Sequence, residues 1–219
     1  MLQDVGRTAI QIAESALSVV GVRVGIEEPP HTAEPLTDGV EIRRYGPRIA
    51  AETRVSGDEI SARSEGFRRL ARYIFGANRS SDTIAMTAPV GDQKIDQGEK
   101  IAMTAPVAQS QSTQESLIRF YMPAEWTMER LPTPIDDRVA LRAVAPETVA
   151  VLRFSGDHGA RSVASHIAKL RDVLRSTGFE ATGEPTCWFY DPPWTLWFRR
   201  RNEIAIPVVD RSAVIPGGQ

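Results

Sequence analysis

The chain has 219 residues, of which 42% are hydrophobic and 25% are charged, as in an ordinary globular protein. Its formal net charge of −2 argues against a general nucleic-acid binder, which would carry a basic excess. The single cysteine, Cys187, excludes an intramolecular disulfide and a cysteine-based zinc motif. Because one cysteine is also typical of a reducing compartment, we expect a cytoplasmic protein.

Residues 1–25 predict an amphipathic helix. Apolar residues recur there at spacings of three and four, namely Leu2, Val5, Ala9, Ile12, Ala16 and Val19. Asp4 and Glu14 interrupt the pattern of a signal peptide, and the apolar stretch is too broken to span a membrane. We expect a docking helix that packs on the body or pairs with another subunit in a homo-oligomer; a membrane-surface helix is the alternative. The acidic, proline-rich residues 26–38 are typical of a linker.

Residues 40–58 and 139–157 are two copies of one stretch, at an offset of 99. They read VEIRRYGPRIAAETRVSGD and VALRAVAPETVAVLRFSGD. Each copy has two alternating apolar runs broken at a proline, which predicts two strands joined by a turn. Each ends in Ser-Gly-Asp, with Asp58 and Asp157 placed to cap a helix. A third echo, IAMTAPV at 84–90 and IAIPV at 204–208, completes a strand-strand-helix-strand unit used twice.

The remaining elements follow in chain order. The first half predicts strands at 40–45 and 48–55, a helix at 59–75, and strands at 83–90 and 100–107 joined by a polar hairpin loop. The polar residues 108–116 predict a mobile segment, and a strand at 117–122 and a proline-rich stretch at 123–137 follow. The second half predicts strands at 139–145 and 148–154, a helix at 160–177, strands near 186–190 and 203–209, and a loose tail at 210–219.

This order predicts an α+β fold in a single domain over residues 39–209, with repeat halves at about 40–107 and 139–208. Two such halves commonly pack about a pseudo-twofold axis, and a groove along that axis suits a ligand.

Two segments carry residues suited to a flat, apolar, acidic ligand. In the first long helix, Arg68 and Arg72 flank an apolar strip that contains Phe67 and Ala71; a solvated basic face is the alternative interpretation. In FYDPPWTLWFRRRNE, large apolar side chains crowd so closely that one strand face cannot bury them all: Trp194, Leu196, Trp197 and Phe198. Some of them must line a loop or a cleft.

The histidines offer few sites for a metal or a nucleophile. His166 lies at the margin of the second helix's apolar face, where a core or boundary role is the alternative to metal binding, and it matches Phe67 at the offset of 99. His158 lies in the loop before that helix, and His31 lies in the linker. No Ser/His/Asp or Cys/His arrangement emerges, so a hydrolase is poorly supported. The acidic pair at residues 136–137 is typical of a solvated turn.

Taken together, several motifs resemble those of the SOUL/haem-binding protein family. They are YDPPWT followed by RRNE, the paired IAMTAPV runs, the VEIRRY strand and the glycine-containing helix from Gly66 to Asn78, and the likeness runs from about Glu27 to Val208. The resemblance implies a distorted antiparallel β-barrel with two long helices, built from two pseudo-twofold-related repeats. It also implies non-enzymatic binding of haem or another porphyrin in a hydrophobic cleft beside the first long helix.

The resemblance implies a site at matching positions. These are Ser64, Phe67, Ala71 and Arg72, where a basic residue near the helix end pairs with a propionate; the loop after Pro193 closes the other side. With the residues above, the expected ligand-binding set is Ser64, Phe67, Arg68, Ala71, Arg72, Trp194, Leu196 and Trp197. The run from Thr195 to Phe198 is bulkier than the proline-rich run usual in the family.

The resemblance does not name an iron ligand, because axial ligation varies within the family. We expect His166 before His158, with Met86 and Met103 as thioether alternatives. The expected function is a cytoplasmic, non-catalytic protein that buffers or delivers haem, with no nucleic-acid partner. The alternative is a small-molecule-binding or protein-interaction module that uses the same groove without haem iron.

Overall fold

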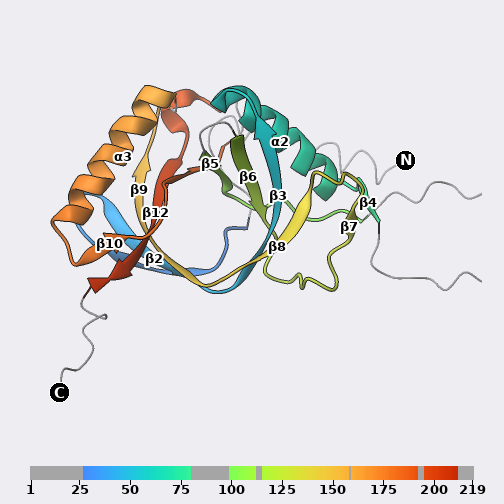
Figure 1. The fold of residues 1–219 in the computed structure, drawn as a ribbon, viewed down its shortest axis with the longest axis horizontal. Helices are drawn as coiled ribbons and strands as arrows, with labels where there is room; N and C mark the ends of the chain where they lie inside the picture. Colours follow the sequence, from blue (N-terminus) through green and yellow to red (C-terminus); the bar gives the residue numbers. More distant parts are fainter. Residues whose placement is uncertain (1–26, 80–98, 112–114, 158, 192–194, 212–219) are drawn as a thin grey trace, which may run out of the picture. The chain divides into compact units, whose positions relative to one another are not determined.

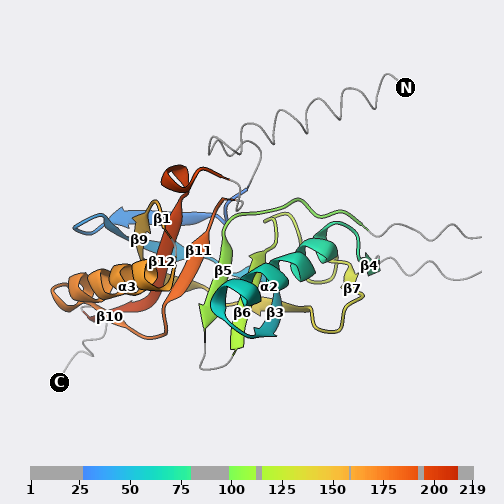
Figure 2. The same ribbon diagram turned by 90° about the horizontal axis from the view of Figure 1, so that it is seen from above.

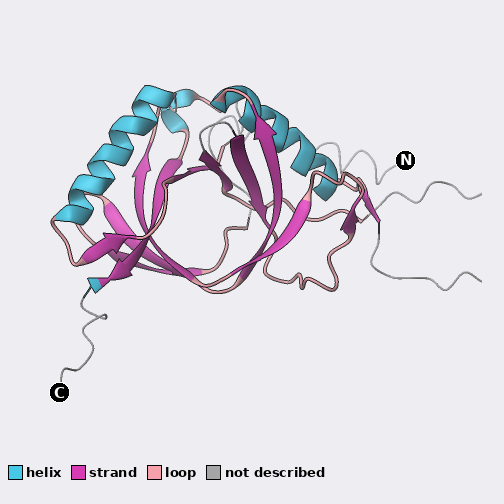
Figure 3. Ribbon diagram, viewed as in Figure 1, coloured by secondary structure: helices cyan, strands magenta, loops and turns pink. Residues whose placement is uncertain are grey.

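The computed structural model describes residues 27–79, 99–111, 115–157, 159–191 and 195–211. The chain divides into two compact units, each with one long helix on an antiparallel sheet. The α2 unit comprises residues 27–30 and 46–146, and the α3 unit comprises residues 31–45 and the chain from 147 onward. The predicted α+β class is confirmed, and Figure 3 shows the helices lying against the strands. The predicted helix at 1–25 lies outside the described residues.

In the α2 unit, four strands pair in the order β5-β6-β3-β8. Their bounds are β5 Val107–Gln111, β6 Glu115–Tyr121, β3 Arg48–Ser56 and β8 Ala140–Val144, and a small separate sheet joins β4 Asn78–Arg79 to β7 Thr133–Pro134. Helix α2, Glu59–Ile74, packs on β3, β5 and β6 (Figure 1). The core between them is apolar and centres on Leu70, Ile74, Ile118 and Phe120.

In the α3 unit, five strands pair in the order β1-β2-β9-β12-β11, and β10 also pairs with β12. Their bounds are β1 His31–Pro35, β2 Val40–Tyr45, β9 Glu147–Phe154, β12 Asn202–Asp210, β11 Thr186–Phe189 and β10 Phe179–Ala181. Helix α3, Ala160–Arg175, packs on β9, β10 and β12, as Figure 2 shows from above. A short 3-10 helix, η1, covers Trp197–Arg199.

The two sequence copies contribute to both units. Strand β2 pairs with β9, and β3 pairs with β8, so each copy gives one strand to each unit. In the β3–β8 pair, Arg48 lies opposite Val144. At the offset of 99, the positions equivalent to these two are Glu147 and Tyr45, and they also lie opposite each other, in the β2–β9 pair. This identical register agrees with a duplication, which stays a prediction, as does the closed barrel. The compact units therefore differ from the predicted sequence halves.

The third echo falls at a different place in the fold. Strand β12 pairs with β9 as β6 pairs with β3, so strand pairing matches residues 204–207 of β12 to residues 118–121 of β6. Residues 84–90, the partner expected from sequence, lie outside the described residues.

Helix starts follow the sequence in one copy only. The carboxylate of Asp58 caps α2 by accepting from the backbone N–H groups of Ile60 and Ser61. The N-cap of α3 is Gly159, and it has no side-chain cap bond; Asp157 instead accepts from the Gly159 N–H. The expected cap at Asp157 was wrong because α3 begins at Ala160, three residues after Asp157, whereas α2 begins at the residue directly after Asp58.

Three other segments differ from the sequence expectations. Residues 26–38 were expected to form a linker, yet they contain the exposed edge strand β1, whose proline stands at the strand end where no ladder donor is lost. The expected strand at 100–107 is absent up to residue 106, apart from a single bridge at Thr104. The expected mobile segment contains β5 and the start of β6, because the buried Gln109 amide donates to the Glu59 carbonyl and the Ser116 hydroxyl.

Candidate functional site

An apolar strip runs along one flank of α2. With 3.6 residues per turn, Ile60, Phe67, Ala71 and Phe75 fall within about 80° of one another around the helix. Phe67 is half-buried, and its ring meets that of Phe120 edge-on at 5.4 Å. The strip's two ends are open, since Ile60 is 61% exposed and Phe75 is 58% exposed. Contiguous exposed apolar patches often mark ligand-binding surfaces, and the strip offers a flat ligand an apolar wall.

The expected polar residues of α2 lie within this strip or beside it on one side. Ser64 is exposed and donates to the Ile60 carbonyl at 3.0 Å. Arg68 is next around the helix; its side chain is exposed and bonds Glu65 at 2.9 Å. Arg72 lies one step further around, in the last turn, and its guanidinium makes no hydrogen bond or ion pair with another described residue. Two cations thus stand beside an apolar strip, as expected from sequence.

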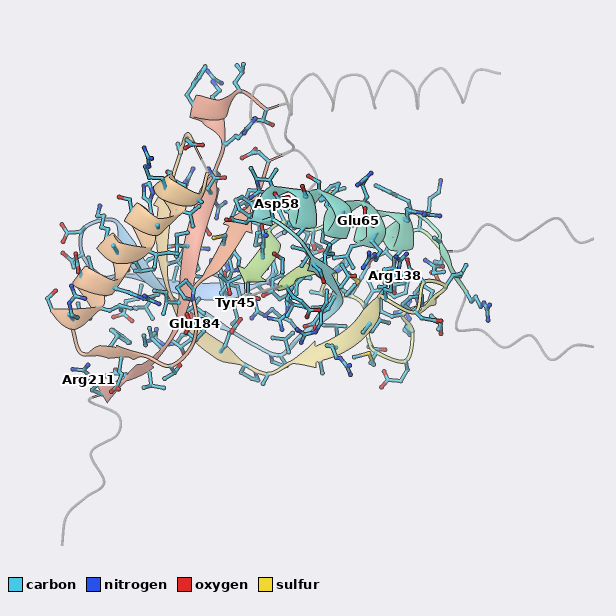
Figure 4. All side chains as sticks on the ribbon, turned by 45° about the horizontal axis from the view of Figure 1, so that its top comes forward. Tyr45, Asp58, Glu65, Arg138, Glu184 and Arg211 are labelled. Atoms are coloured by element: carbon cyan, nitrogen blue, oxygen red, sulfur yellow. The ribbon has the colours of Figure 1, made fainter. Side chains whose placement is uncertain are left out.

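A pocket of about 230 Å³ opens beyond Arg72, within the α2 unit. Its walls include Arg69, Arg72 and Tyr73 from α2, and Asp136, Arg138 and Val139 from the segment before β8. Figure 4 marks Glu65 and Arg138, whose opposite charges act on each other in this part of the molecule. Sequence reasoning missed this pocket, because it treated residues 136–137 as a solvated turn. The available signal was the Asp-x-Arg spacing of Asp136 and Arg138.

The pocket is strongly basic. Arg138 donates to both carboxylate oxygens of Asp136 at 2.8 Å, and these bonds lower the pKa of Asp136 to about 2. Arg69 is almost buried, with only 9% of its side chain exposed, and donates to the Thr53 hydroxyl at 2.7 Å. Asp136 therefore stays ionised at neutral pH, but one carboxylate does not balance three arginines.

The expected loop residues belong to the α3 unit. Trp194 lies outside the described residues. Leu196 is 43% exposed, and residue 197 begins η1. The buried Thr195 anchors this turn, since its carbonyl accepts from the Arg200 guanidinium at 2.9 Å.

His166 lies on α3 against β9. Its ring stacks on Phe154 with centroids 4.1 Å apart, and Nδ1 lies 2.8 Å from the Ser162 carbonyl. This contact favours a proton on Nδ1, which leaves the Nε2 lone pair as the one suited to a metal. Three buried positions of α3, Leu170, Val173 and Leu174, match buried positions of α2 at an offset of 100. In that alignment of the two helices, His166 stands opposite Gly66 rather than Phe67.

The other proposed iron ligands have less to support them. His158 and Met86 lie outside the described residues, and Met103 packs against the core of the α2 unit. Within the described ranges, no group of three or more His, Cys, Asp or Glu side chains could hold a metal ion. In the same ranges, no helix combines the length and the hydrophobicity needed to cross a membrane.

A haem has a flat apolar face and two carboxylates, and α2 offers side chains of matching chemistry. The strip is apolar, and Arg68 and Arg72 are cations. The neighbouring pocket is smaller than the roughly 300–1,000 Å³ typical of sites for drug-sized ligands, so it suits a carboxylate rather than the macrocycle.

Comparison with solved structures defines the class of fold. The chain resembles the EcmrR C-terminal domain with a TM-score of 0.55 at 10% identity, over 82% of this chain and 98% of that one. A structure titled as a hydrolase from Listeria innocua matches with a TM-score of 0.53 at 12% identity, over 80% of this chain and 94% of that one. At such identities these likenesses establish a shared fold only.

Sequence comparison identifies the family. The model of the SOUL heme-binding protein family matches residues 26–207, and the chain belongs to this family. Heme-binding protein 2 of Homo sapiens is 33% identical over 178 residues, which cover 80% of each chain. Heme-binding protein 1 of Xenopus laevis is 29% identical over 170 residues, which cover 76% of this chain and 83% of that one. The resemblance inferred from the motifs is thus confirmed.

Proposed function

We propose that this protein binds haem, without catalysing a reaction on it, against the apolar strip of α2. Membership of the SOUL heme-binding protein family carries the proposal, and the half-open strip beside Arg68 and Arg72 supports it. In this proposal the protein buffers or delivers haem in the cytoplasm and has no nucleic-acid partner. If the protein forms a homo-oligomer, its subunits pair through residues 1–25.

Haem, when bound, supplies an iron centre and two propionates. Residues of this chain cover its apolar face and hold its propionates. Phe67 and Ala71 cover part of the porphyrin face and exclude water from it. Arg68 and Arg72 hold the propionates through charge-assisted hydrogen bonds. Leu196 and residues 194 and 197 belong to the proposed lid, which follows from the resemblance.

Titration of the purified protein with hemin tests this function. We expect a Soret shift that saturates at about one equivalent, because a defined site binds one ligand. A linear response that an unrelated protein of similar size reproduces would refute haem binding. Saturable binding of porphyrin without any contribution from iron would favour the alternative function, a module that uses the same groove for other small molecules or partners.

The propionate partner is tested with Arg72→Ala. A partly shielded guanidinium–carboxylate pair contributes on the order of 1–3 kcal/mol, so hemin affinity should fall roughly ten- to a hundredfold. Arg175→Ala is the matched control, because Arg175 is the basic residue in the last turn of α3. Equal affinity of both variants would move the propionate contact away from Arg72.

The proposed axial ligand is His166. His166→Ala should abolish a six-coordinate, low-spin absorption spectrum of the hemin complex, whereas His166→Met, which offers a thioether, should shift it. His158→Ala is the comparison. A low-spin spectrum that survives in His166→Ala and disappears in His158→Ala assigns the iron to His158. A spectrum unchanged in both variants means that binding is apolar and ionic.

A further inference from the structure

We infer that the pocket between the end of α2 and the segment before β8 is an oxyanion site, for a carboxylate or phosphate group. The inference stands on the charges and geometry of the α2 unit and does not depend on haem binding. Its ligand is either a free small oxyanion or a carboxylate of a larger molecule on the neighbouring strip.

The charge balance of the pocket is the first support. Arg69, Arg72 and Arg138 line it together with a single carboxylate, that of Asp136. Glu65 lies close enough to bond Arg69 at 3.3 Å, but it also bonds the exposed Arg68. Counting these six groups, four positive and two negative charges leave an excess of two positive charges. Asp136 and Glu65 offset part of the repulsion among the three guanidinium groups of the pocket, and a bound oxyanion would offset the rest.

The unused donors are the second support. In the described part of the chain, Arg72 has no hydrogen-bonding partner for its guanidinium, and Nε of Arg69 is buried without an acceptor. Arg138 uses Nε and Nη2 on Asp136, so its Nη1 donors remain. Buried donors normally have acceptors, and an oxyanion supplies several.

The positions of these groups are fixed from several sides. Thr53 and the Arg54 carbonyl hold the Nη1 group of Arg69, and Asp136 holds Arg138. Only Arg72 remains adjustable, at the boundary between the pocket and the apolar strip. This arrangement gives the pocket two arginines held by hydrogen bonds, Arg69 and Arg138, and one, Arg72, whose guanidinium is not bonded to another described residue.

Calorimetric titration with inorganic phosphate at constant ionic strength tests the inference. The wild-type protein should bind phosphate saturably, and Arg72→Ala should weaken the binding about tenfold or more. Asp136→Asn should strengthen it, because asparagine keeps an acceptor for Arg138 but removes the competing negative charge. Arg142→Ala is the control, since Arg142 is exposed in the same unit and does not line the pocket.

The phosphate titrations decide whether the pocket binds an oxyanion and from which source. Absence of saturable binding, or effects of Arg72→Ala and Asp136→Asn equal to that of Arg142→Ala, would overturn the inference. Repeating the titration with hemin-loaded protein distinguishes the two sources of the oxyanion. If hemin abolishes phosphate binding, a propionate occupies the pocket; if both bind together, the pocket serves a free oxyanion. If hemin does not bind at all, the phosphate result still decides the inference.

Discussion

Glu203, on β12 of the α3 unit, has a completely buried carboxylate, which needs hydrogen bonds and counter-charges to be stable there. Two Arg43 nitrogens bond its oxygens at 2.7 and 3.0 Å, and the Tyr190 hydroxyl and Arg201 each bond it at 2.7 Å. Burial by itself raises the pKa of Glu203, but the bonds and charge of Arg43 outweigh burial, and the pKa is lowered. The carboxylate therefore bonds two cations within the unit, Arg43 and Arg201.

Replacing this carboxylate should be costly. Glu203→Gln leaves the buried Arg43 without its main counter-charge, and breaking a buried pair in this way costs about 3–5 kcal/mol. Urea denaturation measures the loss. Glu34→Gln is the control, because the Glu34–Arg44 pair is exposed and such pairs contribute about 0–1 kcal/mol. Similar losses in the two variants would contradict a structural role for the buried network.

The lowered pKa of Glu203 makes the stability of the protein depend on pH. Because the folded-state pKa of Glu203 lies below its ordinary value of 4.5, its contribution to stability is complete above that value and is lost as the pH falls through the folded pKa. Wild-type protein should therefore lose stability more steeply than Glu203→Gln below about pH 4.5 in urea melts at stepped pH. Parallel curves of stability against pH for the two proteins would show that folding does not lower the pKa of Glu203.

Among the elements, α2 is fixed by one close approach to the sheet. Gly66 faces β6, and a Cβ atom built there would lie 2.4 Å from Cγ1 of the buried Ile118. The absence of a side chain thus sets how near α2 lies to its strands, and hence where the apolar strip stands. Sequence patterns predicted the helix from the spacing of its apolar residues. They did not predict this contact, because a single glycine adds nothing to that spacing.

Gly66→Ala should therefore destabilise the protein, although alanine favours a helix by about 1 kcal/mol. Overpacking of a filled core costs about 1–3 kcal/mol, so after the gain in helix propensity we expect a net loss of up to about 2 kcal/mol in a thermal or urea melt. Gly178→Ala is the control, because a Cβ there meets nothing within 4 Å. A gain in stability for Gly66→Ala would mean that α2 shifts freely on its sheet.

The accuracy of the sequence predictions depended on how local each signal was. The two long helices and the strands near residues 40, 48, 148 and 203 were predicted closely, since alternation and helical period are local patterns. Strand β5 was missed because its polar Gln109 is buried through hydrogen bonds that only the folded chain provides. The strip was foreseen through Phe67 and Arg72, whereas the oxyanion pocket required Arg138 to meet α2 from a distant segment.

Across the molecule, the interleaved copies explain why the sequence halves are not structural units. Residues 40–45 belong to the α3 unit and residues 139–146 belong to the α2 unit, so neither half contains all the strands of one sheet. A fragment that ends between the copies would leave β3 without β8 and β9 without β2.

The central claim is that the α2 strip is the haem-binding surface, and hemin titration of Ile60→Ser/Phe75→Ser tests it most directly. Both side chains are more than half exposed, so the fold should survive while apolar contact with the ligand is lost. We predict hemin affinity at least about tenfold below wild type, since full burial of one such side chain contributes about 1.5–3 kcal/mol. Val209→Ser, which removes an exposed apolar side chain from the other unit, should bind as wild type does. Equal affinity of the double variant and the control would contradict the claim.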